Sequence, residues 1–226
     1  GAAGAAGQAG QAGQAGAGGA PVACPKGRGP EMVAVQFPAG WFCIHSTEVS
    51  EHQYSDFLDH DPPLDGQPAN CTWNDSYTNI HEWGSDKIPR SKLPRRKVDW
   101  CDARAYCEWA GKLLCGRPGG GPAPFDAFAS PSASEWYFAC SRGGERAYPY
   151  GMAFDENACV TAEYTGLKKP NYVGATSQCR GGFAGLFDMS GNVAEWEDSC
   201  NVSGGSAECR VRGGGESAPA ELARCQ

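Results

Sequence analysis

Several signatures of common protein classes are missing from this sequence. Its four histidines form neither the HExxH pattern nor any other metal-binding spacing. No nucleophile elbow, phosphate-binding loop or dinucleotide fingerprint occurs. The net charge of −7 argues against a nucleic-acid partner. No apolar run approaches the ~20 residues that a membrane-spanning helix requires.

Cysteine, glycine and proline, in contrast, are abundant. The 12 cysteines are scattered, without a CxxC pair or a Cys/His cluster at zinc spacing, which favours disulfides and an oxidising compartment. The 32 glycines and 16 prolines indicate many turns and few long helices. No signal peptide is visible and the first residue is Gly, so we interpret the sequence as a mature or trimmed chain. We expect an extracytoplasmic location: periplasmic, at the cell surface or secreted.

Residues 1–21 form a low-complexity segment of Gly, Ala and Gln. Glycine recurs at every third position from Gly1 to Gly16, which is the period of collagen, but residues 1–20 contain no proline to support a triple helix. We therefore expect a flexible tether, with a trimerising tail as the alternative. Residues 22–226 are predicted to form one domain.

The first half of this domain carries strand and helix patterns. Residues 32–44 have strand character, and residues 46–59 contain a short helix. Ser50 and Gln53 match the capping box that opens such a helix.

Two further helices are predicted downstream. One begins after Asp99, the expected N-cap, and ends at Gly111. The other spans 132–141 and is opened by a capping box of Ser132 and Glu135. Long loops and short strands fill the remaining sequence, so the predicted fold class is α+β with much irregular structure.

The stretch GLFDMSGNVAEWEDSC, residues 185–200, places two acids around a Ser-Gly-Asn turn. A single short turn rarely supplies both carboxylates of a hydrolase, so catalysis by Asp188 and Glu195 is discounted. Calcium prefers carboxylate and carbonyl oxygens from one winding segment, and the carbonyls of Gly191 and Val193 would complete such a set. Spacing alone leaves a calcium loop and a hairpin with solvated acids equally open.

The same stretch resembles the G-L-Y-D-M-x-G-N-V-W-E-W signature of the formylglycine-generating enzyme family, whose members are also called sulfatase-modifying-factor domains. Further segments are similar to family motifs in the same order: FCIHSTEVSEHQYSDFL, VDWCDARAYCEWAGKLL, SASEWYFACSRGG, YPYG and RVRGGGES. The resemblance runs from about residue 32 to the end. It implies a C-type-lectin-like α+β fold and a divergent member of the bacterial type.

The resemblance also implies structural calcium. It assigns the ligands of one calcium ion to Asp188, Gly191, Val193 and Glu195. A second, weaker calcium site would begin at Asn157 and Ala158, without a clear acidic partner downstream.

The family's oxidase chemistry is not expected in this chain. Active members oxidise a substrate cysteine to formylglycine with oxygen and hold Cu(I) between two cysteines five residues apart. Here Ala218 and its neighbours stand where the first of these cysteines belongs, and only Cys225 follows. Copper, which needs soft thiolates, is therefore not expected. The family's closing I-G-F-R-C strand is also missing, so we expect a domain truncated or divergent at its C-terminus.

The cysteines can be paired in part. The resemblance implies a disulfide between Cys140 and Cys225, and it leaves Cys107 without its family partner. Spacing suggests three local pairs: Cys24–Cys43, Cys159–Cys179 and Cys200–Cys209. The partners of Cys71, Cys101 and Cys115 stay open.

Together these features predict an exported, surface-tethered and non-catalytic member of the family. We expect a calcium-braced binding module for a protein, peptide or glycan ligand, with a lipid anchor upstream of residue 1. No nucleic-acid partner and no membrane span are expected. The alternative is a formylglycine-generating oxidase, or a related superfamily enzyme, whose remaining active-site residues lie beyond Gln226.

Overall fold

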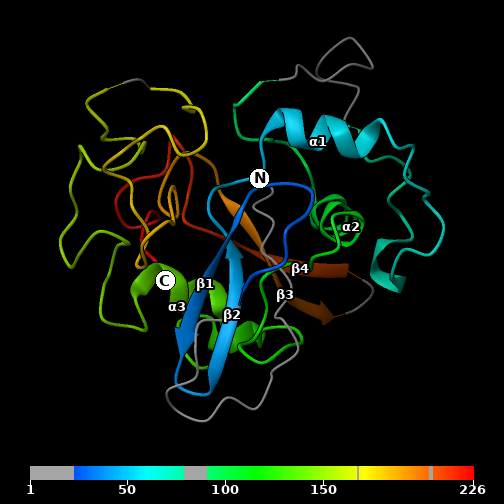
Figure 1. Cartoon of the computed structure of the whole chain (residues 1–226), viewed down its shortest axis with the longest axis horizontal. Helices are drawn as coiled ribbons and strands as arrows, with labels where there is room; N and C mark the ends of the chain where they lie inside the picture. The colour runs from blue at the N-terminus through cyan, green and yellow to red at the C-terminus, as the bar shows by residue number, and fades with distance from the viewer. Residues whose placement is uncertain (1–22, 79–90, 167, 204–205) are drawn as a thin grey trace.

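The computed structural model describes residues 23–78, 91–166, 168–203 and 206–226, and the predicted tether at 1–21 lies outside them. Short elements alternate with long irregular segments (Figure 1). In chain order the elements are β1 (Met32–Phe37), β2 (Gly40–His45), α1 (Glu51–Leu58), η1 (Ala69–Cys71), α2 (Trp100–Trp109), η3 (Phe125–Ala127), α3 (Glu135–Ser141), β3 (Glu195–Ser203) and β4 (Ser206–Arg212). This architecture confirms the predicted α+β class.

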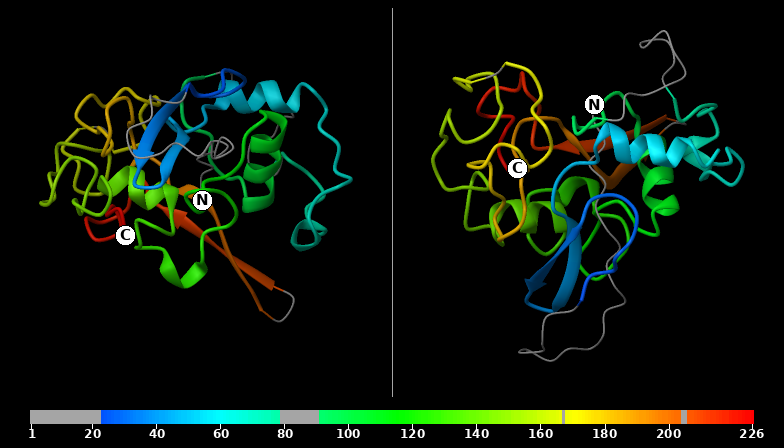
Figure 2. Two further views of the ribbon diagram at one scale, coloured as in Figure 1. Left: turned by 60° about the horizontal axis from the view of Figure 1, so that its bottom comes forward. Right: turned by 45° about the horizontal axis from the view of Figure 1, so that its top comes forward.

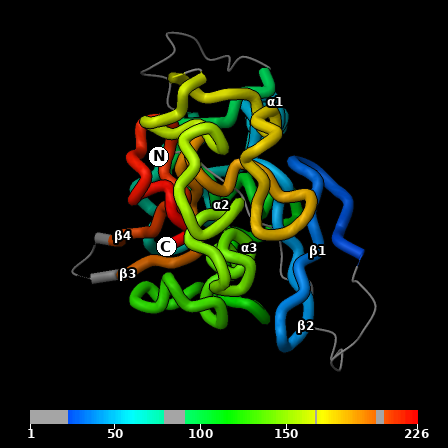
Figure 3. The backbone as a smooth tube through the Cα atoms, turned by 90° about the vertical axis from the view of Figure 1, so that its left-hand side faces the viewer, coloured from blue at the N-terminus to red at the C-terminus, as the bar shows by residue number. Residues whose placement is uncertain are grey.

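The strands form two separate antiparallel pairs, β1–β2 and β3–β4. Figure 1 shows α1 and α2 together on one side of the molecule, while α3 lies against the β1–β2 hairpin on the other. The strands β3 and β4 extend away from the body of helices (Figure 2). Irregular chain between α3 and β3 covers one face together with the C-terminal residues (Figure 3).

Helices α1 and α2 begin where the sequence predicted. Ser50 and Gln53 form the expected capping box at α1, and Asp99 caps α2 in a reciprocal box with Asp102. The two helices pack through aromatic side chains, with the rings of Tyr54 and Tyr106 stacked 5.6 Å apart between centroids. This contact anchors the first of two large core clusters.

Helix α3 begins later than predicted. Its N-cap is Ser134, whose side chain accepts a hydrogen bond from the amide of Tyr137, so the predicted box of Ser132 and Glu135 is wrong. Ser132 instead lies 3.0 Å from the Ser130 hydroxyl, and the Glu135 carboxylate accepts from the Gly116 amide at 3.3 Å. The Glu135 side chain that the predicted box required thus bonds to the preceding loop, and Ser134 provides the cap instead of Ser132.

The segment predicted as strand at 32–44 is a hairpin rather than one strand. Residue Phe37 of β1 pairs with Gly40 of β2, and the register continues to Met32 opposite His45. Val35 and Phe42 point into the second core cluster, where they meet Trp136 of α3 and Leu186. The hairpin therefore packs against α3 and against Leu186 at the start of the acidic stretch.

Five disulfides cross-link the described residues: Cys24–Cys43, Cys71–Cys101, Cys140–Cys225, Cys159–Cys179 and Cys200–Cys209. Four of them join the pairs expected from the sequence, and the fifth ties η1 to the first turn of α2. Cys107 and Cys115 are buried free thiols. This density of disulfides is typical of proteins from an oxidising compartment.

None of the helices in the described ranges is long and apolar enough to cross a membrane.

A buried ion pair links β3 to β4, and one of its members is also hydrogen-bonded to the N-cap of α3. Arg212 donates from Nε to the Glu197 carboxylate at 2.8 Å, and both side chains are almost fully buried. The Ser134 hydroxyl donates to the other oxygen of Glu197, and Arg212 also donates to the carbonyl of Phe128 at 2.6 Å. Each charge is thus satisfied by a partner that only this packing supplies.

Replacing one member of this pair will be costly. We expect Arg212→Ala to lower the free energy of unfolding by about 3–5 kcal/mol, because the carboxylate of Glu197 stays buried without its counter-ion. Urea unfolding measures the change. As control, Glu108→Ala removes a half-exposed i,i+4 pair with Arg104 and will cost less than about 1 kcal/mol. Equal losses in the two variants would contradict the assigned role of Arg212.

Candidate functional site

The acidic stretch is a tightly wound segment, not a hairpin. Asp188, Gly191 and Asn192 all have left-handed backbone conformations, with φ of 59°, 69° and 56°. A Cβ atom at Gly191 would collide with the carbonyl oxygen of Val160, so this position requires glycine. Strand β3, which starts at Glu195, pairs with β4 further along the chain.

The two acids of this segment are buried. Asp188 is 2% exposed and Glu195 is 9% exposed, so the alternative of a hairpin with solvated acids is wrong. Asp188 accepts a hydrogen bond from the Gly174 amide at 2.5 Å, and Glu195 accepts from the indole N–H of Trp136 at 2.6 Å. Each carboxylate keeps oxygen lone pairs beyond these single bonds.

A third buried carboxylate, Glu48, was missed by the sequence analysis. It is fully buried, and its Oε1 accepts a hydrogen bond from the Asn192 side-chain amide at 2.9 Å. Its Oε2 is also buried and has no hydrogen-bond partner. A signal existed in the sequence, because Glu48 lies inside the family-like segment FCIHSTEVSEHQYSDFL, two residues before the Ser50 that caps α1.

We call Glu48, Asp188 and Glu195 the acidic cluster. Burial raises the pKa of Asp188 to about 6, against the lowering effect of the Gly174 amide. Burial raises the pKa of Glu195 to about 7, and the nearby Asp188 charge adds to the increase. The pKa of Glu48 lies well above its ordinary value, first through burial and then through the charges of Asp188 and Glu195. These three groups therefore repel one another when ionised.

The chemistry of this cluster suits a hard divalent cation. All atoms of the cluster that could coordinate a cation are oxygens, which calcium prefers. One of them, Oε2 of Glu48, accepts no hydrogen bond from the protein. In the described part of the chain, no three acidic, histidine or cysteine side chains are arranged to hold a metal ion by themselves. The predicted set at Asp188 and Glu195 includes only two carboxylates, and the main-chain carbonyls of Gly191 and Val193 would complete it.

The weaker second calcium site lies elsewhere, beside the Cys159–Cys179 disulfide. Asn157 is exposed, and its side-chain oxygen accepts a hydrogen bond from Thr165 at 2.5 Å. Ala158 is buried, with its amide bonded to the carbonyl of Asp155 at 3.1 Å. The side-chain oxygen of Asn157, a residue predicted to begin this site, thus already accepts from a hydroxyl donor.

The position predicted for copper lies in a turn. Ala218 donates its amide to the Gly215 carbonyl and accepts at its own carbonyl from the amide of Ala162. The two free thiols of the described residues belong to different core clusters, Cys107 to the first and Cys115 to the second. Burial raises the pKa of both thiols, so they stay protonated at neutral pH.

Comparison with known proteins shows the family to which the chain is similar. Residues 11–226 match the family model described as sulfatase-modifying factor enzyme 1-like domain. The chain is similar to a Bos taurus protein named inactive C-alpha-formylglycine-generating enzyme 2, with 34% identity over 130 residues, covering 51% of this chain and 36% of that protein. The Mus musculus protein of the same name is 32% identical over 144 residues, covering 58% and 40%.

A Mus musculus protein named formylglycine-generating enzyme is also similar, at 30% identity over 133 residues, covering 51% of this chain and 30% of that protein. The chain spans less than half the length of each of these curated relatives.

The acidic cluster predicts how stability depends on pH when metal is chelated. The folded-state pKa values of about 6 for Asp188 and about 7 for Glu195 lie above the ordinary values, so the folded protein binds more protons than the unfolded chain. This contribution to stability is complete below about pH 4 and is lost as the pH rises toward about 7. Unfolding in urea with EDTA present measures the slope.

Glu195→Gln will make this slope shallower, because Gln carries no titrating proton and its side-chain oxygen still accepts from Trp136. The matched control, Glu208→Gln, changes an exposed acid of β4 and will leave the slope as it is. If Glu195→Gln has the same slope as the parent chain, the assigned coupling is wrong.

Proposed function

This chain belongs to the sulfatase-modifying factor enzyme 1-like family, and we propose that it serves there as a non-catalytic, calcium-braced binding module outside the cytoplasm. The proposal rests on a comparison of the predicted calcium site with the position at which the family holds copper. The acidic cluster is present with oxygen donors, whereas the position of the copper cysteines holds Ala218 and its neighbours.

Calcium would be held by the carboxylates of Asp188 and Glu195 and the carbonyls of Gly191 and Val193. A bound calcium ion supplies positive charge that offsets the repulsion of buried carboxylates. Glu48 then acts as a positioning residue, because its bond to Asn192 holds the turn between the two acids. Asn192 in turn accepts from the amide of Asn171 at 2.8 Å, which joins a further loop to the turn. The site would therefore stabilise the fold rather than perform chemistry.

The absence of oxidase chemistry is supported by the state of the thiols. Copper-dependent oxidation needs two accessible thiolates close together. Cys107 and Cys115 are fully buried, protonated and assigned to separate core clusters. Two of the similar proteins are themselves named inactive, which agrees with loss of this activity within the family.

The location and attachment follow from composition and cross-links. Five disulfides favour a periplasmic, cell-surface or secreted domain. Residues 1–21 would act as a tether, because a segment composed mainly of Gly, Ala and Gln has too little apolar surface to form a core.

The second candidate is a formylglycine-generating oxidase, favoured by the 30% identity to the murine enzyme of that name. In that case the missing copper ligands would have to come from residues beyond Gln226.

Removal of calcium will lower the thermal stability of the chain. A ligand present at a hundredfold excess over its dissociation constant stabilises the folded state by about 2.7 kcal/mol, which corresponds to about 5–10 °C for a chain of this size. We expect EDTA to lower the thermal midpoint by this amount at neutral pH, and added calcium to restore it. Differential scanning calorimetry measures both shifts.

Asp188→Asn and Glu195→Gln will lose this response to calcium, because each removes one charged ligand. Asn157→Ala serves as control and will keep it, since the weaker site lies elsewhere. An unchanged midpoint of the parent chain in EDTA would exclude the calcium assignment.

Oxidation of a substrate cysteine will not occur in this chain. We expect no formylglycine when the chain is incubated with copper, oxygen and a cysteine-containing peptide derived from a sulfatase. Mass spectrometry of the peptide detects the product, and the murine formylglycine-generating enzyme is the positive control. Multiple turnovers by this chain would establish the oxidase alternative.

A further inference from the structure

The largest of three cavities among the described residues is a groove that none of the predicted ligands of copper or calcium lines. It has a volume of about 800 Å³, against 290 and 270 Å³ for two other cavities. It lies between the chain that follows η1, the first turns of α2 and the β3–β4 hairpin, and we call it the Trp73 groove. Its volume falls within the ~300–1,000 Å³ usual for small-ligand sites.

The indole of Trp73 forms one wall of this groove. The residue is 64% exposed. Among the large hydrophobic side chains in the described part of the chain, only Met152 is more exposed, and Leu222 has the same value. Its N–H donates to the carbonyl of Asn70 at 2.8 Å, so the polar edge of the ring is satisfied within the protein. What the ring offers to a ligand is therefore its flat apolar face.

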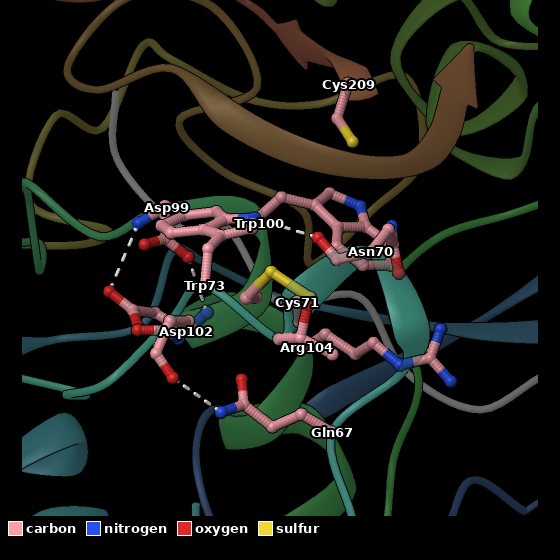
Figure 4. The surroundings of a disulfide bond; sticks show 12 residues. Gln67, Asn70, Cys71, Trp73, Asp99, Trp100, Asp102, Arg104 and Cys209 are labelled. Atoms are coloured by element: carbon pink, nitrogen blue, oxygen red, sulfur yellow. Dashed lines mark hydrogen bonds between the residues drawn. A yellow bond between two sulfur atoms is a disulfide. The ribbon is translucent and has the colours of Figure 1, made fainter. Parts of the chain in front are cut away.

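A second indole, that of Trp100, contributes to the same groove and is fixed. Trp100 is 6% exposed and donates its N–H to the carbonyl of Glu197 at 3.1 Å. Figure 4 shows both indoles between the Cys71 disulfide and Cys209 of the hairpin. Two aromatic surfaces with satisfied N–H groups thus line one open space.

Disulfides hold both sides of the groove. Cys71–Cys101 ties the chain before Trp73 to α2, and Cys200–Cys209 ties β3 to β4 beside the groove. A wall that is fixed before the ligand arrives loses little conformational entropy on binding. The groove is therefore built to present its rings in a set position.

The polar groups of the groove carry no net charge. Its ten lining residues include one cation, Arg104, and one anion, Asp198, along with the amide of Asn70 and the hydroxyl of Thr72. The Arg104 guanidinium lies over the Trp100 ring at 5.4 Å. This balance favours a neutral ligand that has many hydrogen-bonding groups over an acidic or basic one.

We propose that the Trp73 groove binds a neutral oligosaccharide. The inference rests on the binding-module function proposed above and names its ligand class. A sugar ring has an apolar C–H face that stacks on an indole, and hydroxyl pairs that match planar amide, carboxylate and guanidinium groups. Trp73 supplies the face, while Asn70, Arg104 and Asp198 supply the hydrogen-bonding partners.

Isothermal titration calorimetry of the full chain with four neutral probes tests the proposal: maltohexaose, cellohexaose, mannohexaose and chitohexaose. We expect at least one probe to bind. Trp73→Ala will weaken that binding about tenfold, a loss of about 1.4 kcal/mol, because the stacking face is removed, and Trp73→Phe will restore part of it. Trp73 is exposed, so its replacement will leave the thermal midpoint nearly unchanged, which calorimetry of the same samples verifies.

The matched control is Tyr172→Ala, which removes an exposed aromatic residue outside the groove and will leave binding unchanged. The proposal is overturned if none of the probes binds at millimolar concentration, or if Trp73→Ala binds as the parent does. Binding of an uncharged Gly/Ser/Ala hexapeptide that depends on Trp73, with no saccharide bound, would assign the groove to a peptide instead. A chain that responds to calcium but binds no saccharide keeps the proposed function and loses only this assignment.

Discussion

The mutual repulsion of three buried carboxylates is the constraint on which this fold depends. Asp188 and Glu195 lie on one short segment, Glu48 comes from a segment far away in the sequence, and each of the three is at least nine-tenths buried. Burying such groups together is unfavourable unless protons or a cation compensate their charge. The wound segment between Asp188 and Asn192 is hydrogen-bonded to chain near residues 160, 171–174, 179 and 213–216. The charge state of the acidic cluster therefore affects the stability of several loops at once.

Strand β3 links this cluster to the Trp73 groove. Its alternate residues Glu195, Glu197 and Ser199 are buried, whereas Trp196, Asp198 and Cys200 are partly exposed, as the two-residue period of a strand requires. The buried set holds the acidic cluster and the ion pair with Arg212. The other set supplies Asp198 and Cys200 to the groove. One strand thus contributes buried charged residues on one face and part of the proposed ligand groove on the other.

Local signals in the sequence predicted much of this structure. Capping boxes placed the starts of α1 and α2, because Ser50 and Asp99 bond to residues only three positions away. The start of α3 was misplaced because Glu135 bonds to Gly116, a contact that no local pattern encodes. Four disulfide pairs followed from spacing or resemblance, but Cys71–Cys101 depends on how η1 packs against α2.

The candidate site was predictable only in part, for the same reason. Asp188 and Glu195 lie on one short segment, so their pattern was visible. Glu48 lies 140 residues before Asp188 and reaches the cluster only through folding. The Trp73 groove was invisible to sequence analysis, because its walls come from four separate parts of the chain.

The most direct test of this account is the calcium content of the folded chain. We expect atomic emission spectroscopy of the protein, after dialysis against calcium and gel filtration, to find about one calcium ion per chain. Asp188→Asn and Glu195→Gln will each lose it. Calcium-free parent protein after this treatment, or an equal calcium content in the parent and both variants, would contradict the central claim that a cation compensates the acidic cluster.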